Sequence, residues 1–363
     1  MPEGSGPGPA PRAAGRIPAA SALLRFRGAV SLERYDDWVA PWRIPHRERD
    51  LYLPERGTER GAFTAGVRLT LRTDSSWLSC RYRSHPPPDM GEPKEVARVD
   101  VCCDGRLVAT VELATDGAES SFRVAGLPAG SKRVELWLPC YNRFELRELE
   151  VAPDAEVTAD DQVSPRWVHY GSSISNGRGA TSPGRAWHAL LARSAGLDLT
   201  SVGLGGVCHL QPAFARLIRD TPADLLTCCI GINVCKYGTH NARSFSDALI
   251  GFLQIVREGH PGTPLVVTSA IHSPRWEDAP GAAGLTLPEY REFTRRAVAA
   301  LRRHGDRDLH YVDGLQLFGP ADEHLMLEPP GSAPLHLGPR GHVLFASRLR
   351  RALRELAVPA LTS

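Results

Sequence analysis

Residues 167–177 read WVHYGSSISNG and decide the fold of the second half of the chain. The apolar run ending at Tyr170 predicts a buried strand, and Gly171 breaks it before a group of small hydroxyl residues. A helix is expected to begin near Gly184, so these serines lie on a turn at the carboxyl end of a strand. Open α/β sheets place their reactive groups at that edge. Ser173 is therefore the candidate nucleophile, and neighbouring backbone N–H groups, its own included, can face a developing oxyanion.

From residue 166 onward, predicted strands and helices alternate. Helices with apolar residues at helical spacing follow each expected strand, which predicts a parallel five-stranded sheet covered on both faces. The strands are expected at 167–170, up to Val202, and at 225–230, 264–270 and 309–312, and the helices at 184–195, 213–219, 245–256, 288–302 and 339–356.

The first half of the chain has a different sequence pattern, with alternating apolar residues and no amphipathic helix between the strands. Asp104-Gly105 lies between two alternating runs, which indicates a hairpin with a two-residue turn. This pattern predicts a β-sandwich or jelly roll. The expected organisation is a disordered tail over 1–23, a sandwich over 24–152, a linker over 153–165 and an α/β domain over 166–358.

Bulk composition excludes several classes of function. The 363 residues suit two hydrophobic cores, and a formal charge of +2 gives no electrostatic reason for nucleic acid or anionic membrane as a partner. The eight cysteines contain no Cys-x-x-Cys spacing, so neither a metal site nor another cofactor is expected, and the adjacent pairs 102–103 and 228–229 are interpreted as small apolar filler. No segment has the length of a signal peptide core or a membrane span, and a cytoplasmic location is the default expectation.

Three later loops carry the other groups that acyl transfer to a serine needs. Residues 203–209 follow the second strand and hold three glycines, which allow close backbone approach. Asn233 follows the third strand and offers an uncharged amide donor. A base is expected near the C-terminus, where His336 precedes the last helix, while His209, His272 and His324 are rivals on residue type alone.

In their order, these four segments resemble the signature blocks of the SGNH/GDSL hydrolases. The resemblance implies a flavodoxin-like three-layer fold in which Ser173 is the nucleophile and His336 the general base. It also implies an oxyanion hole formed by the N–H groups of Ser173 and Gly206 and by the side chain of Asn233. The N-terminal half resembles the β-sandwich that precedes the catalytic domain in one subgroup, which includes carbohydrate esterases and an acyltransferase of polyketide tailoring.

The match departs from the family at the position of the catalytic acid. Ala333 stands where the family has Asp three residues before the histidine, an acid that orients the imidazole and stabilises the imidazolium. Either a Ser173–His336 dyad or a substitute acceptor is expected. The acceptors within chain reach are Ser332, Glu328, Asp322 and the backbone carbonyl of Ala333, and Glu328 is the first to test.

Three functions follow from these residues. The leading hypothesis is a serine esterase or acylhydrolase that acts on a small-molecule ester or an acylated sugar or metabolite. The second is an O-acyltransferase of secondary metabolism that uses the same acyl-serine. The third is a binding protein with weakened or lost catalysis, because of Ala333. The sequence leaves acyl and alcohol specificity, hydrolysis versus transfer, and the oligomeric state open.

Overall fold

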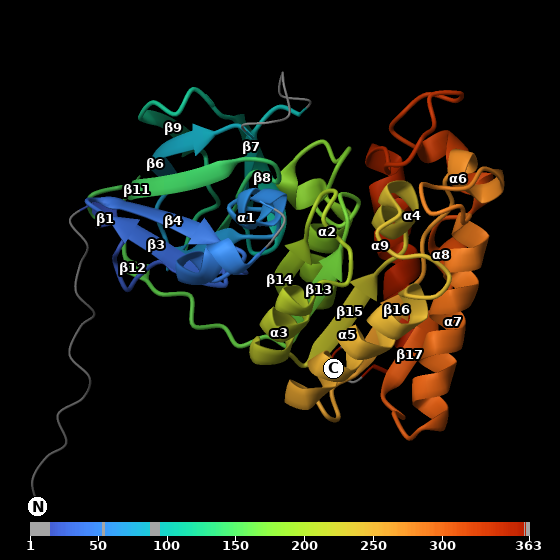
Figure 1. Cartoon of the computed structure of the whole chain (residues 1–363). Helices are drawn as coiled ribbons and strands as arrows, with labels where there is room; N and C mark the ends of the chain where they lie inside the picture. Colours follow the sequence, from blue (N-terminus) through green and yellow to red (C-terminus); the bar gives the residue numbers. More distant parts are fainter. Residues whose placement is uncertain (1–14, 53–54, 88–94, 359, 361–363) are drawn as a thin grey trace, which may run out of the picture.

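The computed structural model describes residues 15–52, 55–87, 95–358 and 360. Figure 1 shows two parts side by side: an antiparallel β domain from the first half of the chain and a parallel sheet with helices on both faces from the second half. The fold class expected from the sequence is confirmed, with an all-β domain preceding a three-layer α/β domain.

The β domain consists of two antiparallel sheets that enclose one hydrophobic core. The first sheet has the order β3 (Ser31–Tyr35), β4 (Trp38–Trp42), β11 (Arg143–Val151), β6 (Trp77–His85), β9 (Ser120–Ala125), and β1 (Arg16–Pro18) also pairs with β11. The second has the order β12 (Val157–Thr158), β5 (Arg68–Thr73), β10 (Lys132–Trp137), β7 (Arg98–Cys103), β8 (Arg106–Glu112), and β2 (Arg25–Arg27) also pairs with β5.

Local sequence signals in this domain are confirmed at the hairpin and at the cysteines. Cys103 pairs with Arg106 across a two-residue turn, in which Asp104 and Gly105 both have positive φ, as a type I′ turn requires. Cys102 and Cys103 point into different hydrophobic clusters, because neighbours in a strand face opposite sides. All eight cysteines are free thiols.

The tail and the linker differ from the sequence expectation. The predicted disordered tail over 1–23 is wrong for residues 15–23, because β1 pairs with β11 and buries Ile17 in the sandwich core, while residues 1–14 lie outside the described part. The predicted linker contains β12, which pairs with β5. A strand of two or three residues is too short to show a period of two, so the sequence gives no signal for either one.

Two short helices also interrupt the β domain, where the sequence predicts only strands. They are the 3-10 helix η1 (His46–Leu51) and α1 (Glu55–Gly61). The α1 sequence, ERGTERG, has no apolar stripe and therefore no amphipathic pattern.

The second domain has the strand order β14 (Asp198–Gly203), β13 (Arg166–Gly171), β15 (Leu225–Cys229), β16 (Leu265–Thr268), β17 (Leu309–Val312), all parallel. This is the flavodoxin-like order, whose switch point lies at the first strand. Helices α2 and α9 pack together, and α3, α5 and α7 form a second packed group (Figure 1). Their bounds are α2 (Trp187–Ala195), α3 (Pro212–Asp220), α5 (Phe245–Gly259), α7 (Leu287–Arg303) and α9 (Pro339–Glu355).

The remaining short helices are α4 (Ile232–Tyr237), α6 (Pro274–Asp278) and α8 (Gly314–Leu317), with 3-10 turns η2 (Pro183–Arg185) and η3 (Pro320–Leu325). The helix expected from residue 184 is thus a 3-10 turn followed by α2. None of the helices within the described residues is long and apolar enough to cross a membrane.

Strand register brings the candidate loops together. β13 lies between β14 and β15, and Gly171 at its end is the register partner of Gly203 at the end of β14. The turn that carries Ser173 therefore begins beside the glycine-rich loop, and the loop after β15 begins on its other side.

Candidate active site

The turn that presents Ser173 is held by close packing beneath it. A Cβ added to Gly171 would lie 2.1 Å from Oγ of Ser175, and one added to Gly203 would lie 2.4 Å from the Ser175 carbonyl oxygen. Only glycine leaves room for the turn at the ends of these two strands. Ser175 Oγ is in turn hydrogen-bonded to Nε2 of buried His169 at 2.7 Å. Burial lowers the pKa of His169 to about 3, so its imidazole is neutral at pH 7 and serves as scaffold.

The serine turn meets the C-terminal loop, which carries His336 and precedes α9, at Ser173. Its Oγ lies 2.8 Å from His336 Nε2, although 163 positions separate the two residues. The other ring nitrogen, Nδ1, is hydrogen-bonded to a carboxylate oxygen of Glu328. The second Glu328 oxygen accepts the backbone N–H groups of Leu335 at 3.1 Å and of His336 at 2.9 Å. One carboxylate therefore orients both the ring and the backbone of His336.

The position of Glu328 follows from local chain pairing. Leu327 N–H donates to the His336 carbonyl at 2.8 Å, and Met326 forms an isolated antiparallel bridge with Leu337. The chain between these points folds back through Pro329, Pro330 and Gly331, which are turn residues. Because the chain folds back here, Glu328 lies against the His336 ring although it is eight positions earlier in the chain. It takes the place expected for an aspartate at position 333, three residues before the histidine.

The electrostatics of Glu328 suit an orienting acid. Burial alone would raise its pKa, but the hydrogen bonds and charge interaction with His336 and the two backbone N–H groups outweigh burial and lower the pKa to about 2. The other acceptors considered from the sequence have different partners: Asp322 binds Arg348, and Ser332 Oγ donates to the Pro329 carbonyl. Ala333 lies on the same loop with a φ of 59°.

Two neighbouring loops supply candidate oxyanion donors. A Cβ added to Gly205 would lie 3.6 Å from the Ser173 Cβ, so the glycine-rich loop runs directly beside the serine, with Gly206 next in the chain at a φ of 75°. Asn233 is buried, and its Oδ1 accepts the Cys208 N–H at 3.2 Å. Because the oxygen is used in this way, the amide NH₂ is left to donate. Asn233 belongs to the first turn of α4, where the sequence suggests only a loop.

The rival histidines have other roles. His209 Nε2 lies 3.0 Å from the Gly206 carbonyl, so this histidine belongs to the glycine-rich loop. His272 is buried between Glu277 and Glu323, 3.3 and 3.4 Å from their carboxylate oxygens. His324 is exposed and contacts the Ala321 carbonyl. Of the histidines that the sequence leaves as rivals, only His336 is hydrogen-bonded to Ser173.

Residues of the β domain also reach the site, and sequence reasoning does not find them. The Tyr141 hydroxyl donates to the Ser173 carbonyl at 3.2 Å, and buried Arg43 donates to Asn176 Oδ1 at 2.9 Å and to the Gly203 carbonyl at 2.5 Å. These contacts join residues up to 160 positions apart, and no local pattern encodes them.

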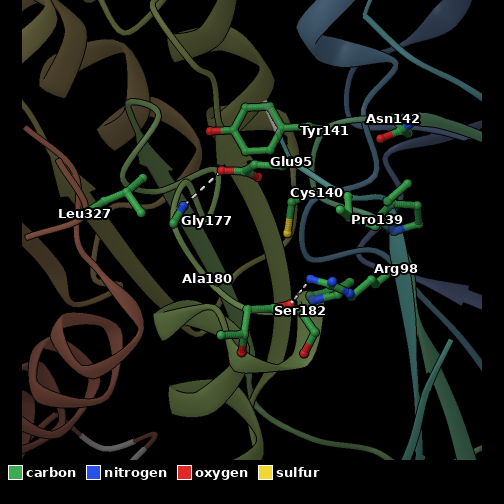
Figure 2. A pocket seen from close by; sticks show the side chains of 15 residues that line it. Glu95, Arg98, Pro139, Cys140, Tyr141, Asn142, Gly177, Ala180, Ser182 and Leu327 are labelled. Atoms are coloured by element: carbon green, nitrogen blue, oxygen red, sulfur yellow. Dashed lines mark hydrogen bonds between the residues drawn. The ribbon is translucent and has the colours of Figure 1, made fainter. Parts of the chain in front are cut away.

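A cavity of about 230 Å³ lies beside these contacts, between the two domains (Figure 2). The β domain contributes Tyr141, Glu95 and Arg98, and the α/β domain contributes Gly177 and Leu327. Glu95 accepts the Gly179 N–H at 3.0 Å, and burial raises the pKa of its carboxyl. Within the described residues, no three His, Cys, Asp or Glu side chains gather as metal ligands would.

Comparison with known proteins covers both halves of the chain. Residues 24–147 match the family model described as SsfX3, N-terminal domain, and residues 169–344 match that of the GDSL-like Lipase/Acylhydrolase family. A solved structure of the salicylyl-acyltransferase SsfX3 from a tetracycline biosynthetic pathway is 44% identical, with a TM-score of 0.89 over 95% of this chain and 98% of that one. No curated protein sequence matches the chain.

More distant structures share the fold. A protein from Bacteroides ovatus described as a GDSL-like lipase is 18% identical, with a TM-score of 0.75 over 94% of this chain and 97% of that one. A family two carbohydrate esterase from Cellvibrio japonicus is 15% identical, with a TM-score of 0.63 over 94% and 97%. The two family matches and the 44% identity over nearly the whole chain lead to one conclusion: the protein belongs to the GDSL-like lipase/acylhydrolase family and carries an SsfX3-type N-terminal domain.

Proposed function

We propose that the protein is a serine-dependent acyl-transfer enzyme that forms a covalent acyl-Ser173 intermediate from a small-molecule ester. The observation that carries this proposal is the continuous hydrogen-bond chain from Ser173 Oγ through both His336 ring nitrogens to Glu328. Such a chain activates a hydroxyl, because the imidazole takes its proton and the carboxylate stabilises the resulting imidazolium.

The proposed reaction has two balanced halves. Ser173 Oγ attacks the ester carbonyl carbon while His336 Nε2 takes the hydroxyl proton, and the oxyanion is held by the N–H groups of Ser173 and Gly206 and the amide of Asn233. The tetrahedral intermediate then collapses, and His336 gives the proton to the departing alkoxide. In the second half, a hydroxyl loses its proton to His336 and attacks the acyl-serine carbonyl carbon. The bond from that carbon to Ser173 Oγ then breaks, His336 returns the proton to Ser173 Oγ, and the new ester or acid is released.

A fluorophosphonate probe tests the first half of this scheme. We expect its phosphorus to bond Ser173 Oγ with loss of fluoride, and peptide mass spectrometry should place the label on the peptide that contains residue 173. The Ser332→Ala variant, which changes an exposed serine of the C-terminal loop, should label as the parent does. Absence of label from folded parent protein, or a label on another serine, would contradict the proposal.

For the second half, we propose that an acceptor hydroxyl rather than water takes the acyl group. This choice rests on the 44% identity, over 95% of the chain, to a protein described as a salicylyl-acyltransferase. The cavity between the domains reaches the Ser173 turn through Tyr141, which lines it and donates to the Ser173 carbonyl, so it offers room for an acceptor near the serine. The esterase hypothesis keeps the same acyl-serine and differs only in the group that attacks it.

Product partitioning distinguishes transfer from hydrolysis. With p-nitrophenyl acetate as donor and a series of alcohols and phenols as acceptors, a transferase should convert part of the acetyl group to the new ester, in amounts that rise with acceptor concentration. The free acid should fall correspondingly, relative to the nitrophenolate released. If acid equals nitrophenolate at every acceptor concentration, the protein is a hydrolase.

A binding protein without catalysis, the third hypothesis, has less support than an enzyme. It depends on Ala333 leaving the histidine without an acid, whereas Glu328 lies against His336 Nδ1.

A further inference from the structure

The β domain places two arginine side chains against the carbonyl groups of the glycine-rich loop. Arg43 directly follows β4 and is fully buried. It donates to the carbonyls of Gly203 at 2.5 Å and Phe63 at 2.6 Å. It also donates to Asn176 Oδ1, on the Ser173 turn, and to the Arg60 carbonyl at 2.6 Å. Burial lowers its pKa to about 10, which leaves the guanidinium charged at neutral pH.

The second arginine contacts a peptide two positions further along that loop. Arg60 Nε donates to the Gly205 carbonyl at 3.3 Å. The residue is only 6% exposed, and its guanidinium carbon lies 4.9 Å from the centre of the Phe63 ring. Its Nη1 atom is buried and has no hydrogen-bond acceptor among the described residues. Both guanidinium groups therefore present their N–H groups to carbonyl oxygens of the loop, Arg43 to Gly203 and Arg60 to Gly205.

The carbonyl that Arg60 contacts has a chemical link to the proposed oxyanion hole. Gly205 C=O and Gly206 N–H belong to the same planar peptide group. A cation at the oxygen draws electron density through the amide, which makes the N–H at its other end a stronger donor. The same contact fixes the plane of a peptide between two glycines, which would otherwise rotate easily.

We infer that Arg60 is a positioning residue that orients and polarises the Gly205–Gly206 peptide so that Gly206 N–H binds the oxyanion. This inference rests on the proposed function, because it concerns the same tetrahedral intermediate. It assigns the β domain an electrostatic part in the reaction: its guanidinium charges favour the state in which negative charge appears on the substrate oxygen. The ester ground state carries no such charge, so the benefit is specific to the transition state.

Substitution of Arg60 tests the inference, because a residue that acts on the transition state should change kcat and leave KM unchanged. Arg60→Ala should lower kcat on p-nitrophenyl acetate by roughly tenfold to a hundredfold, as is typical when a residue that orients a directly acting group is removed. KM should stay within about twofold of the parent value. Arg60→Lys keeps the charge and should retain more activity. Added guanidinium ion at millimolar concentration should restore part of the activity of Arg60→Ala, while equal sodium chloride should not. Arg47→Ala, at an exposed arginine of η1, is the matched control.

The outcomes distinguish the loss of the proposed Arg60 role from unfolding of the variant and from failure of the proposed function. A kcat within twofold of the parent, a change in KM alone, or a loss that neither lysine nor guanidinium relieves would overturn the role of Arg60. Thermal melting of each variant identifies a loss that comes from unfolding, and Arg60→Lys then decides, since it preserves volume and charge. If the parent itself shows no Ser173-dependent turnover, the proposed function fails and this inference fails with it; parent turnover with an unaffected Arg60→Ala overturns the inference alone.

Discussion

Replacing Ser173 with alanine is expected to lower kcat for ester cleavage by about six powers of ten, the loss seen when the nucleophile of a serine hydrolase is removed. The substitution deletes one oxygen atom, the one that lies 2.8 Å from His336 Nε2. Neither neighbouring serine of the turn can replace it, because Ser175 Oγ is bound to His169 beneath the turn and Ser172 is buried.

The measurement is release of nitrophenolate from p-nitrophenyl acetate, with the melting temperature recorded for the same samples. The Ser173→Ala protein should melt near the parent temperature, because the lost hydroxyl is hydrogen-bonded only to His336 among the described residues. Ser332→Ala is the control for a serine-to-alanine change in the same region. Turnover of Ser173→Ala within about tenfold of the parent would mean that another group carries the reaction, and the acyl-serine scheme would be abandoned.

Replacing Glu328 with glutamine should lower kcat by up to about four powers of ten, the scale measured when the acid of a serine triad becomes an amide. Glutamine has nearly the same volume as glutamate, but it is neutral and can present an N–H group to Nδ1. The imidazole is then free to hold its proton on Nε2, where it cannot accept the Ser173 proton. The imidazolium that forms in the reaction also loses its stabilising charge.

The pH dependence of stability gives an independent check on Glu328. Its folded-state pKa, about 2, lies below the ordinary glutamate value of 4.5, so its ionisation stabilises the folded protein above about pH 4.5. That contribution is lost as pH falls from about 4.5 toward 2. The difference in unfolding free energy between parent and Glu328→Gln should therefore be largest near neutral pH and shrink across this window.

Denaturant unfolding at several pH values measures this difference, with Glu156→Gln as control at an exposed glutamate. Glu328→Asp is the second variant for activity: it keeps the charge but shortens the reach by one methylene, so it should fall between parent and glutamine. If Glu328→Gln retains activity within tenfold of the parent, His336 acts without an orienting acid and the protein works as a dyad.

The sequence alone determined the layout of the fold and most of the proposed site. Helical and strand periodicities are local, because hydrogen bonding in these elements repeats over a few residues, so the alternation after residue 166 and the hairpin at Asp104-Gly105 could be read directly. The loops of Ser173, Gly206 and Asn233 each follow a parallel strand, and parallel strands end at one edge of a sheet. The convergence of these loops was therefore predictable from their order.

Only the tertiary structure decided which acid orients His336 and what the β domain adds. Glu328 reaches the imidazole because its loop folds back beside His336. From the sequence, several other acceptors were equally near in the chain, and only the tertiary structure shows which one contacts the ring. The contacts of Arg43, Arg60 and Tyr141 with the α/β domain join residues 32 to 160 positions apart. Such contacts depend on how two complete domains dock, and docking is set by the summed shape and burial of both surfaces rather than by any pattern within a short stretch of chain.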